Sequence, residues 1–79
     1  MKPSLADLPL GQHAEITSID CDRVLSRRLM EMGLLPGTRV RLVRVAPLGD
    51  PIELRVRNYS LSVRRAEAAK IGVNPEESA

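Results

Sequence analysis

Cys21 stands in the one segment of the sequence that combines a thiol with carboxylates, Asp20-Cys21-Asp22. His13, the single histidine of the chain, is predicted to lie at the start of the strand that leads into this segment. Thiolate, imidazole and carboxylate groups bind transition metals, so His13, Asp20, Cys21 and Asp22 are candidate metal ligands. Their spacing matches no closed four-ligand motif, and the alternative is a small cysteine beside a helix cap with a histidine at the surface. The sequence therefore predicts no required cofactor, and a loose or fortuitous transition-metal site stays open as the alternative.

Catalytic chemistry has little support in the sequence. Acyl or group transfer needs a nucleophile with a partner base, and nucleotide chemistry needs a glycine-rich loop that holds phosphate groups. Neither motif is present, and His13 has no orienting partner in a recognisable pattern. These residues predict a protein without enzyme activity.

Arginine is the residue type with the clearest functional pattern. Residues 23–65 hold ten arginines and three acidic residues, a net charge of +7, although the whole chain has a formal net charge of only +2. Outward positions on two neighbouring predicted strands carry four of these arginines, and a hairpin would join them into one patch of guanidinium groups. The candidates are Arg39, Arg41, Arg55 and Arg57, with Arg64 as an extension.

Three interpretations of this patch are open. It can be a solvated barrel face whose arginine stems cover apolar surface. It can dock an acidic protein surface, because arginine binds carboxylates with two parallel hydrogen bonds and is enriched at interfaces. It can contact nucleic acid through phosphates, but single-strand binders stack bases on aromatic rings, and the chain has no Phe or Trp and one tyrosine, Tyr59, predicted to face inward. Nucleic acid is therefore the least favoured partner.

Leu48 is a second candidate for partner binding. It lies between Pro47 and Gly49 in a predicted loop tip. An apolar residue at this place either folds back onto the protein or enters a pocket of a partner, and the sequence does not choose between the two.

The elements that would position these residues are short. A helical turn at residues 4–8 is capped by Ser4, and a helix at residues 22–32 is capped by Asp22 and ended by Gly33. Pro36-Gly37 predicts a type II turn. Alternation predicts strands at residues 12–19, 38–45, 52–57 and 59–64. Irregularities are expected at Ile19 and at Leu42-Val43. After the last of these strands we expect a helical turn at 66–71, a short pairing at Val73 and a frayed polar tail at 74–79. The order predicts a mainly β fold, a small antiparallel barrel of about five strands that closes and so removes its sheet edges.

The length and composition fit this architecture. A chain of 79 residues forms one domain, and its single cysteine allows no internal disulfide, which suits a reducing cytosol. No apolar run approaches the roughly 20 residues of a membrane helix, and the N-terminus lacks a secretory pattern. We expect one domain over residues 1–79, located in the cytoplasm.

Five segments together carry a family resemblance. The most specific is Leu29-Met30-Glu31-Met32-Gly33-Leu34-Leu35-Pro36-Gly37-Thr38, a helix that ends in glycine before two apolar residues and Pro-Gly. Ser4-Leu5-Ala6-Asp7-Leu8, Ala46-Pro47-Leu48-Gly49-Asp50-Pro51-Ile52, Leu61-Ser62-Val63-Arg64 and Glu67-Ala68-Ala69-Lys70-Ile71 occur in the matching order. With these segments the chain resembles FeoA, the small cytosolic component of bacterial ferrous iron uptake, over nearly its whole length.

The resemblance implies an SH3-like barrel that binds and assists FeoB, a membrane protein with a cytosolic G domain, and that is recruited by FeoB to the inner face of the membrane. It implies no catalysis by the chain itself and leaves the oligomeric state open. The domain is also similar to the C-terminal SH3-like domains of metal-dependent repressors, so a stand-alone regulatory or nucleic-acid-binding barrel is the alternative. The lack of a preceding helix-turn-helix in this sequence favours the transport accessory.

Overall fold

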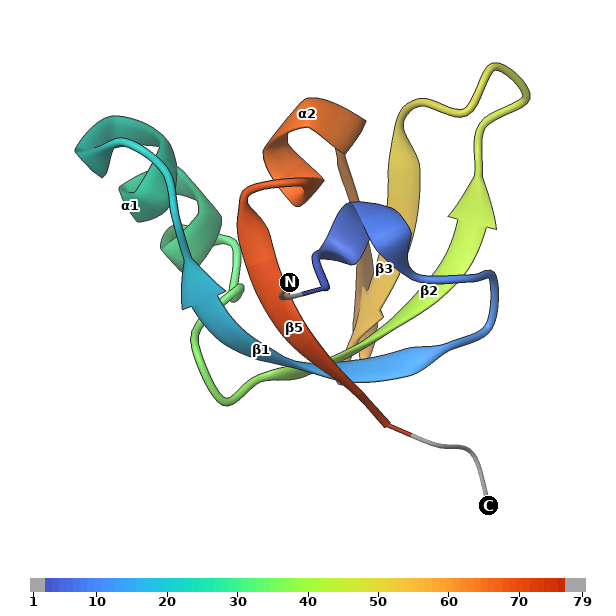
Figure 1. Cartoon of the computed structure of the whole chain (residues 1–79), viewed down its shortest axis with the longest axis horizontal. Coiled ribbons are helices and arrows are strands. Elements are labelled where there is room, and N and C mark those ends of the chain that lie inside the picture. The colour runs from blue at the N-terminus through green and yellow to red at the C-terminus, as the bar shows by residue number, and fades with distance from the viewer. Residues whose placement is uncertain (1–2, 77–79) are drawn as a thin grey trace.

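The computed structural model describes residues 3–76 and contains one sheet with three short helical segments (Figure 1). In chain order the elements are η1 (Leu5–Asp7), β1 (His13–Ile19), α1 (Arg23–Glu31), β2 (Arg39–Val45), β3 (Ile52–Val56), β4 (Tyr59–Val63), α2 (Arg65–Ala68) and β5 (Ile71–Glu76). No helix within residues 3–76 has the length and apolar character needed to cross a membrane.

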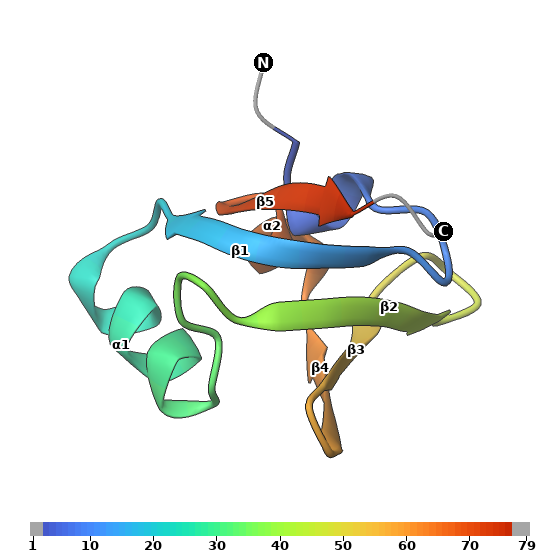
Figure 2. The same cartoon turned by 90° about the horizontal axis from the view of Figure 1, so that it is seen from below.

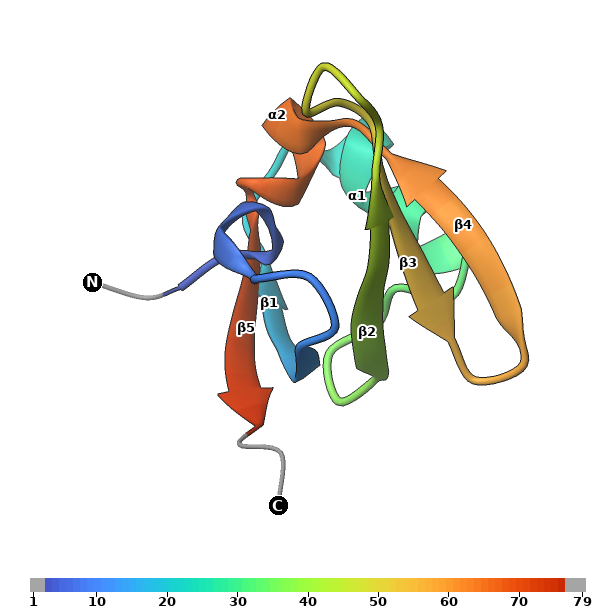
Figure 3. The same ribbon diagram turned by 90° about the vertical axis from the view of Figure 1, so that its right-hand side faces the viewer.

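The sheet has the strand order β4-β3-β2-β1-β5, and all its pairings are antiparallel (Figure 2). It is strongly curved, and the first and last strands in this order face different sides of the molecule (Figure 3). The predicted fold class is confirmed. The expected closure is not complete, because β4 is paired with β3 and has no pairing with β5. The edge of β5 is instead covered by the N-terminal segment, where Ser4 pairs with Gly72 and the Val73 amide donates to the Pro3 carbonyl.

Alternating apolar residues of the strands form the core. The inner positions Ile52, Leu54 and Val56 of β3 are buried, as the period of two predicts for a half-buried strand. Leu5 and Leu8 of the N-terminal turn are buried in the same cluster and cover one end of it. The remaining members of the buried cluster are Ala14, Ile16, Leu29, Leu34, Val40, Leu42, Val63, Ala68, Ile71 and Val73.

Both ends of α1 follow from local sequence. The Asp22 side chain accepts a 2.8 Å hydrogen bond from the Leu25 amide and so caps the first turn. Gly33 adopts a φ of 99°, and the Leu34 amide donates back to the Leu29 carbonyl at 3.0 Å, which is the Schellman ending. The following turn is closed by a 2.9 Å bond from the Thr38 amide to the Leu35 carbonyl, with Gly37 at a φ of 92°. The predicted cap, helix end and type II turn are confirmed.

The C-terminal region differs from its prediction. The predicted helical turn at 66–71 is present as α2, but it is shorter and ends at Ala68, and β5 runs through Asn74 and Pro75 to Glu76. The expectation of a frayed tail is therefore wrong for residues 74–76, and residues 77–79 lie outside the described part of the chain. The reason is tertiary, because the whole length of β1 is available as a pairing partner. The predicted irregularity at Leu42-Val43 is confirmed, since the β2–β3 register shifts between Leu42 and Arg44.

Candidate functional site: an arginine groove and an exposed leucine loop

The strand register brings the predicted arginines together on the outer face of the sheet. Arg41 of β2 lies directly opposite Arg55 of β3, and His13 of β1 lies directly opposite Arg41 on the other side. These residues line a shallow groove of about 460 Å³. We call it the arginine groove; its polar lining consists of His13, Thr38, Arg39, Arg41, Arg55 and Arg57.

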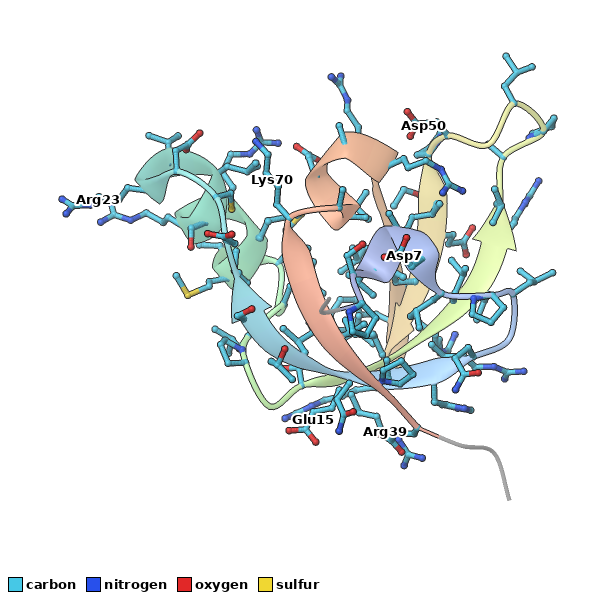
Figure 4. The ribbon with its side chains drawn as sticks, viewed as in Figure 1. Asp7, Glu15, Arg23, Arg39, Asp50 and Lys70 are labelled. Atoms are coloured by element: carbon cyan, nitrogen blue, oxygen red, sulfur yellow. The ribbon has the colours of Figure 1, made fainter. Side chains whose placement is uncertain are left out.

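Opposite charge is scarce in the groove. Arg39 forms a 2.9 Å salt bridge with Glu76, the one ion pair within residues 3–76, and lies opposite Glu15 on β1. Figure 4 shows Glu15 and Arg39 extending from the same side of the sheet. The Arg41 Nε donates to the Gly11 carbonyl at 3.3 Å, and no carboxylate forms a salt bridge with Arg41 or Arg55 in the described chain. Like charges directly opposite on a sheet destabilise it, so this arrangement costs the fold free energy.

The backbone conformation of Arg57 makes a second unfavourable contribution to the stability of the fold. Arg57 occupies the first position of the two-residue loop between β3 and β4 and has a φ of 55°. Favoured two-residue hairpin turns require positive φ at this position, and glycine, asparagine or aspartate normally supply it. An arginine held there places a cation at the groove despite a backbone conformation that its Cβ disfavours.

The position of Arg64 differs from the sequence expectation, and that of Tyr59 matches it only in part. Arg64 precedes α2 as its N-cap residue, at the opposite end of β4 from Arg57, so it does not extend the groove. Tyr59 lies opposite the buried Val56, on the inner face as predicted, but at the rim of the barrel, where it is 40% exposed. Its hydroxyl donates to the Met32 carbonyl at 2.6 Å and thereby ties β4 to the end of α1.

Leu48 does not fold back onto the protein. It is 97% exposed at the tip of the β2–β3 loop, so the first of its two predicted alternatives is wrong. The loop around it is well anchored. The Gly49 amide donates to the Ala46 carbonyl at 2.7 Å, and the Ala46 amide donates to the Pro51 carbonyl at 3.0 Å.

Arg65 anchors this loop to the rest of the molecule, a role that sequence reasoning missed. Its Nε donates to the Gly49 carbonyl at 2.9 Å, its Nη1 donates to the Ala6 carbonyl at 3.0 Å, and its amide donates to the Asp50 carboxylate at 2.9 Å. Figure 4 places Asp50 beside the loop, close to α2. These contacts join residues far apart in the sequence, so no local pattern announces them. They restrain the backbone on either side of Leu48, which lowers the entropy lost when a partner covers the loop.

The candidate metal ligands are not brought together. His13 begins β1, and Asp20 follows its last residue, so the length of the strand, roughly 20 Å, separates them. His13 instead belongs to the arginine groove, and Asp22 is engaged as the α1 cap. Within residues 3–76 no three His, Cys, Asp or Glu side chains are placed to hold one metal ion. His13 does lie at the start of the strand, as predicted, but at its far end from Cys21, so His13, Asp20, Cys21 and Asp22 do not form one site.

The chemistry of Cys21 follows from its surroundings. Burial, and then the negative charge of Asp22, raises the pKa of the Cys21 thiol above its ordinary value. The thiol is therefore protonated at neutral pH and a poor nucleophile, because the thiolate is the reactive form.

We expect Cys21 to react with iodoacetamide more slowly in the folded protein than in urea at neutral pH. Because the folded state holds the thiol proton more tightly, this group contributes stability below about pH 8.5, the ordinary thiol pKa. That contribution is lost as the pH rises through the higher pKa of the folded state. Urea unfolding across this range checks the sign, and Cys21→Ser should remove this part of the alkaline loss. Alkylation at equal rates in the two states would contradict the assignment.

Comparison with known proteins finds a family model and relatives that match most of the chain. The FeoA domain model matches residues 4–75. A Porphyromonas gingivalis protein described as an Fe(2+) transport protein A/Fe(2+) transporter FeoB fusion is 39% identical over 69 residues. The match covers 87% of this chain, which spans only 8% of the length of that relative.

Solved structures agree with the fold. The FeoA protein from Chlorobium tepidum superposes with a TM-score of 0.83 at 44% identity, covering 92% of this chain and 68% of that one. Stenotrophomonas maltophilia FeoA, described as a procaryotic SH3 domain protein complexed with zinc, has a TM-score of 0.82 at 30% identity and covers 98% of this chain and 99% of its own. A manganese-dependent transcriptional repressor reaches a TM-score of 0.85 over 95% of this chain and 37% of that chain, but at 17% identity it shows the fold alone.

Proposed function

The chain belongs to the FeoA domain family, and we propose that it is a non-catalytic accessory protein of ferrous iron uptake that binds the cytosolic part of the transporter FeoB. The arginine groove and Leu48 form the binding surface. The protein acts in the cytoplasm and is held at the inner face of the membrane by FeoB. The role requires no resident cofactor, and titration with Fe(II) and Zn(II) checks this directly, because the Stenotrophomonas maltophilia relative is described complexed with zinc.

The observation that carries this proposal is the pairing of Arg41 with Arg55. Two arginines directly opposite each other, with no carboxylate in a salt bridge to either within residues 3–76, lower the stability of the sheet. The left-handed φ of Arg57 adds to this cost. An acidic partner surface would supply the missing counter-charges, and bidentate contacts between guanidinium and carboxylate groups would orient it.

The two parts of the surface lie within the span of one interface. Arg41 and Leu48 are seven positions apart along β2 and its loop, so they lie at most roughly 25 Å from each other. A standard interface buries about 800 Å² on each partner and covers such a span. Leu48 supplies an apolar anchor, and the arginines supply orientation and charge.

The fused relative supports a physical association of the two proteins. Two domains joined in one polypeptide meet at a high effective concentration, so a contact between them needs little intrinsic affinity. Binding would then shift a conformational equilibrium of FeoB by the difference in affinity for its states.

Neutralising the paired arginines tests this function. We expect Arg41→Gln with Arg55→Gln to weaken binding to the cytosolic part of FeoB about tenfold, since two charge-assisted contacts are lost. The stability of the free chain should hold or rise, because the like-charge pair is removed. Calorimetric titration and urea unfolding measure the two effects.

The matched control changes two arginines elsewhere. Arg23 and Arg27 of α1 are exposed and lie outside the arginine groove, so Arg23→Gln with Arg27→Gln removes the same charge. Equal loss of affinity in both double variants would point to net charge and against a specific surface. Micromolar retention of mixed-sequence DNA near physiological salt, abolished by the groove variant, would instead favour a nucleic-acid-binding barrel.

A further inference from the structure

The outer edge of β4 is an unpaired sheet edge. β4 (Tyr59–Val63) pairs with β3 on one side, and among residues 3–76 no backbone hydrogen bond joins it to another element on the other side. The opposite edge of the sheet is covered, because residues 3 and 4 bond to β5. Figure 2 shows β4 as the last strand on its side of the sheet.

The hairpin register shows which backbone groups point outward. The pair Val56–Tyr59 closes the two-residue loop, and in such a hairpin the closing pair exchanges both of its hydrogen bonds. Bonded and non-bonded pairs then alternate, so Ser60 and Ser62 point their N–H and C=O groups away from β3. The free edge therefore presents two donors and two acceptors in the spacing of a β-ladder.

This edge carries none of the usual protection against another strand. Sheet edges are normally blunted by lysine, proline or a bulge. β4 reads Tyr-Ser-Leu-Ser-Val, without a charge or a proline, and its register to β3 is regular throughout. The register shifts of the sheet lie elsewhere, between β2 and β3 and between β1 and β5.

We propose that the edge of β4 receives an extended, acidic segment of the partner as an added strand. This inference rests on the proposed function and states how FeoB is held. The added strand would bond to the outward groups of Ser60 and Ser62, a mode in which main-chain hydrogen bonds supply affinity and side chains supply specificity.

Charge on the outer face sets the chemistry of the added strand. Ser60 lies opposite Arg55, with Arg57 in the adjoining loop, and its small side chain leaves these guanidinium groups accessible. A residue of the added strand opposite Ser60 would lie about 10 Å from the β3 backbone. The long side chains of Arg55 and Arg57 can reach a carboxylate at that distance. Ser62 lies opposite Glu53, so an acidic residue is disfavoured there. The segment accordingly carries a carboxylate beside Ser60 and a neutral or basic residue beside Ser62.

A second copy of this chain fits the edge less well. The antiparallel register that sets Ser60 against Ser62 of another copy also sets Arg57 against Arg65 and aligns basic ends with each other. Like charges opposed at both ends disfavour that pairing.

Amide hydrogen exchange with the cytosolic part of FeoB as the probe tests the added strand. The Ser60 and Ser62 amides should gain at least about tenfold protection in the complex, whereas the Leu61 amide, already bonded to β3, should change little. Ser62→Pro removes one outward donor without breaking the β3 ladder, and we expect it to lower affinity about tenfold. Ser62→Thr keeps the donor and is the matched control. The exchange measurement uses the unaltered chain, so it decides the matter even if Ser62→Pro does not fold.

The outcomes separate this inference from the proposed function. FeoB binding that is weakened by the Arg41→Gln, Arg55→Gln variant but leaves the Ser60 and Ser62 amides unprotected overturns the added strand and keeps the function. Protection that appears with rising concentration of the chain alone makes a second copy the occupant and also overturns it. The absence of any complex with FeoB overturns both.

Discussion

Replacing Gly33 by alanine is expected to lower the free energy of unfolding by about 3 kcal/mol. Gly33 has a φ of 99°, and a side chain in the left-handed region costs about 1–2 kcal/mol. A Cβ at this position would also lie 2.0 Å from the Tyr59 hydroxyl oxygen, so the ring must move. Moving it breaks the 2.6 Å bond to the Met32 carbonyl, worth about 1 kcal/mol. For a chain of this length that is a large part of a total stability of roughly 4–12 kcal/mol.

Gly49 provides the matched control for Gly33→Ala. Its φ of 87° is similar, but nothing lies within 4 Å of a Cβ built there. Gly49→Ala should therefore cost only the backbone part of the effect, about 1–2 kcal/mol. Urea unfolding of both variants measures the difference, and Tyr59→Phe in the Gly33→Ala background should recover part of the loss. Equal destabilisation at the two glycines would show that the contact with Tyr59 contributes nothing.

Local chemistry explains what the sequence could predict. The cap at Asp22, the helix end at Gly33 and the turn at Gly37 depend on residues within a few positions of one another, and all three are confirmed. The strand alternation was sufficient to place Arg41 beside Arg55, because a hairpin of neighbouring strands leaves few registers.

Long-range contacts account for the features that the sequence could not predict. The Arg65 anchor joins the β2–β3 loop to η1, and the Tyr59 hydroxyl joins β4 to α1, in both cases across more than a dozen residues. The extension of β5 to Glu76 depends on the free length of β1 and not on the strand propensity of Asn74 and Pro75. The free edge of β4 likewise follows from the topology as a whole, since only the complete strand order shows which strand lacks a second neighbour.

Leu48→Asp is expected to leave the fold intact and to weaken binding to the cytosolic part of FeoB about a hundredfold. The side chain is 97% exposed and contributes almost nothing to the core, so circular dichroism and the unfolding midpoint should not change. If Leu48 enters an apolar pocket of the partner, its burial supplies about 1.5–3 kcal/mol, and a carboxylate in that pocket adds an uncompensated desolvation cost. Arg65 keeps the loop in place in the variant, which confines the change to one side chain.

Two further variants separate the contribution of apolar contact from that of charge. Leu48→Asn introduces no charge, so it should still lose most of the affinity if burial is responsible, and should retain it if an acidic partner merely repels the new carboxylate. Val24→Asp introduces the same charge at an apolar residue that is also exposed but lies on α1, outside the β2–β3 loop and the arginine groove, and it should bind like the unaltered chain. Unchanged titration curves for Leu48→Asp with a native spectrum would show that Leu48 does not contribute to binding. It would then be one of the single exposed leucines that are common on protein surfaces. The arginine groove would then have to supply the affinity alone, and binding would depend steeply on salt, since exposed ion pairs are screened within about 10 Å at 0.1 M ionic strength.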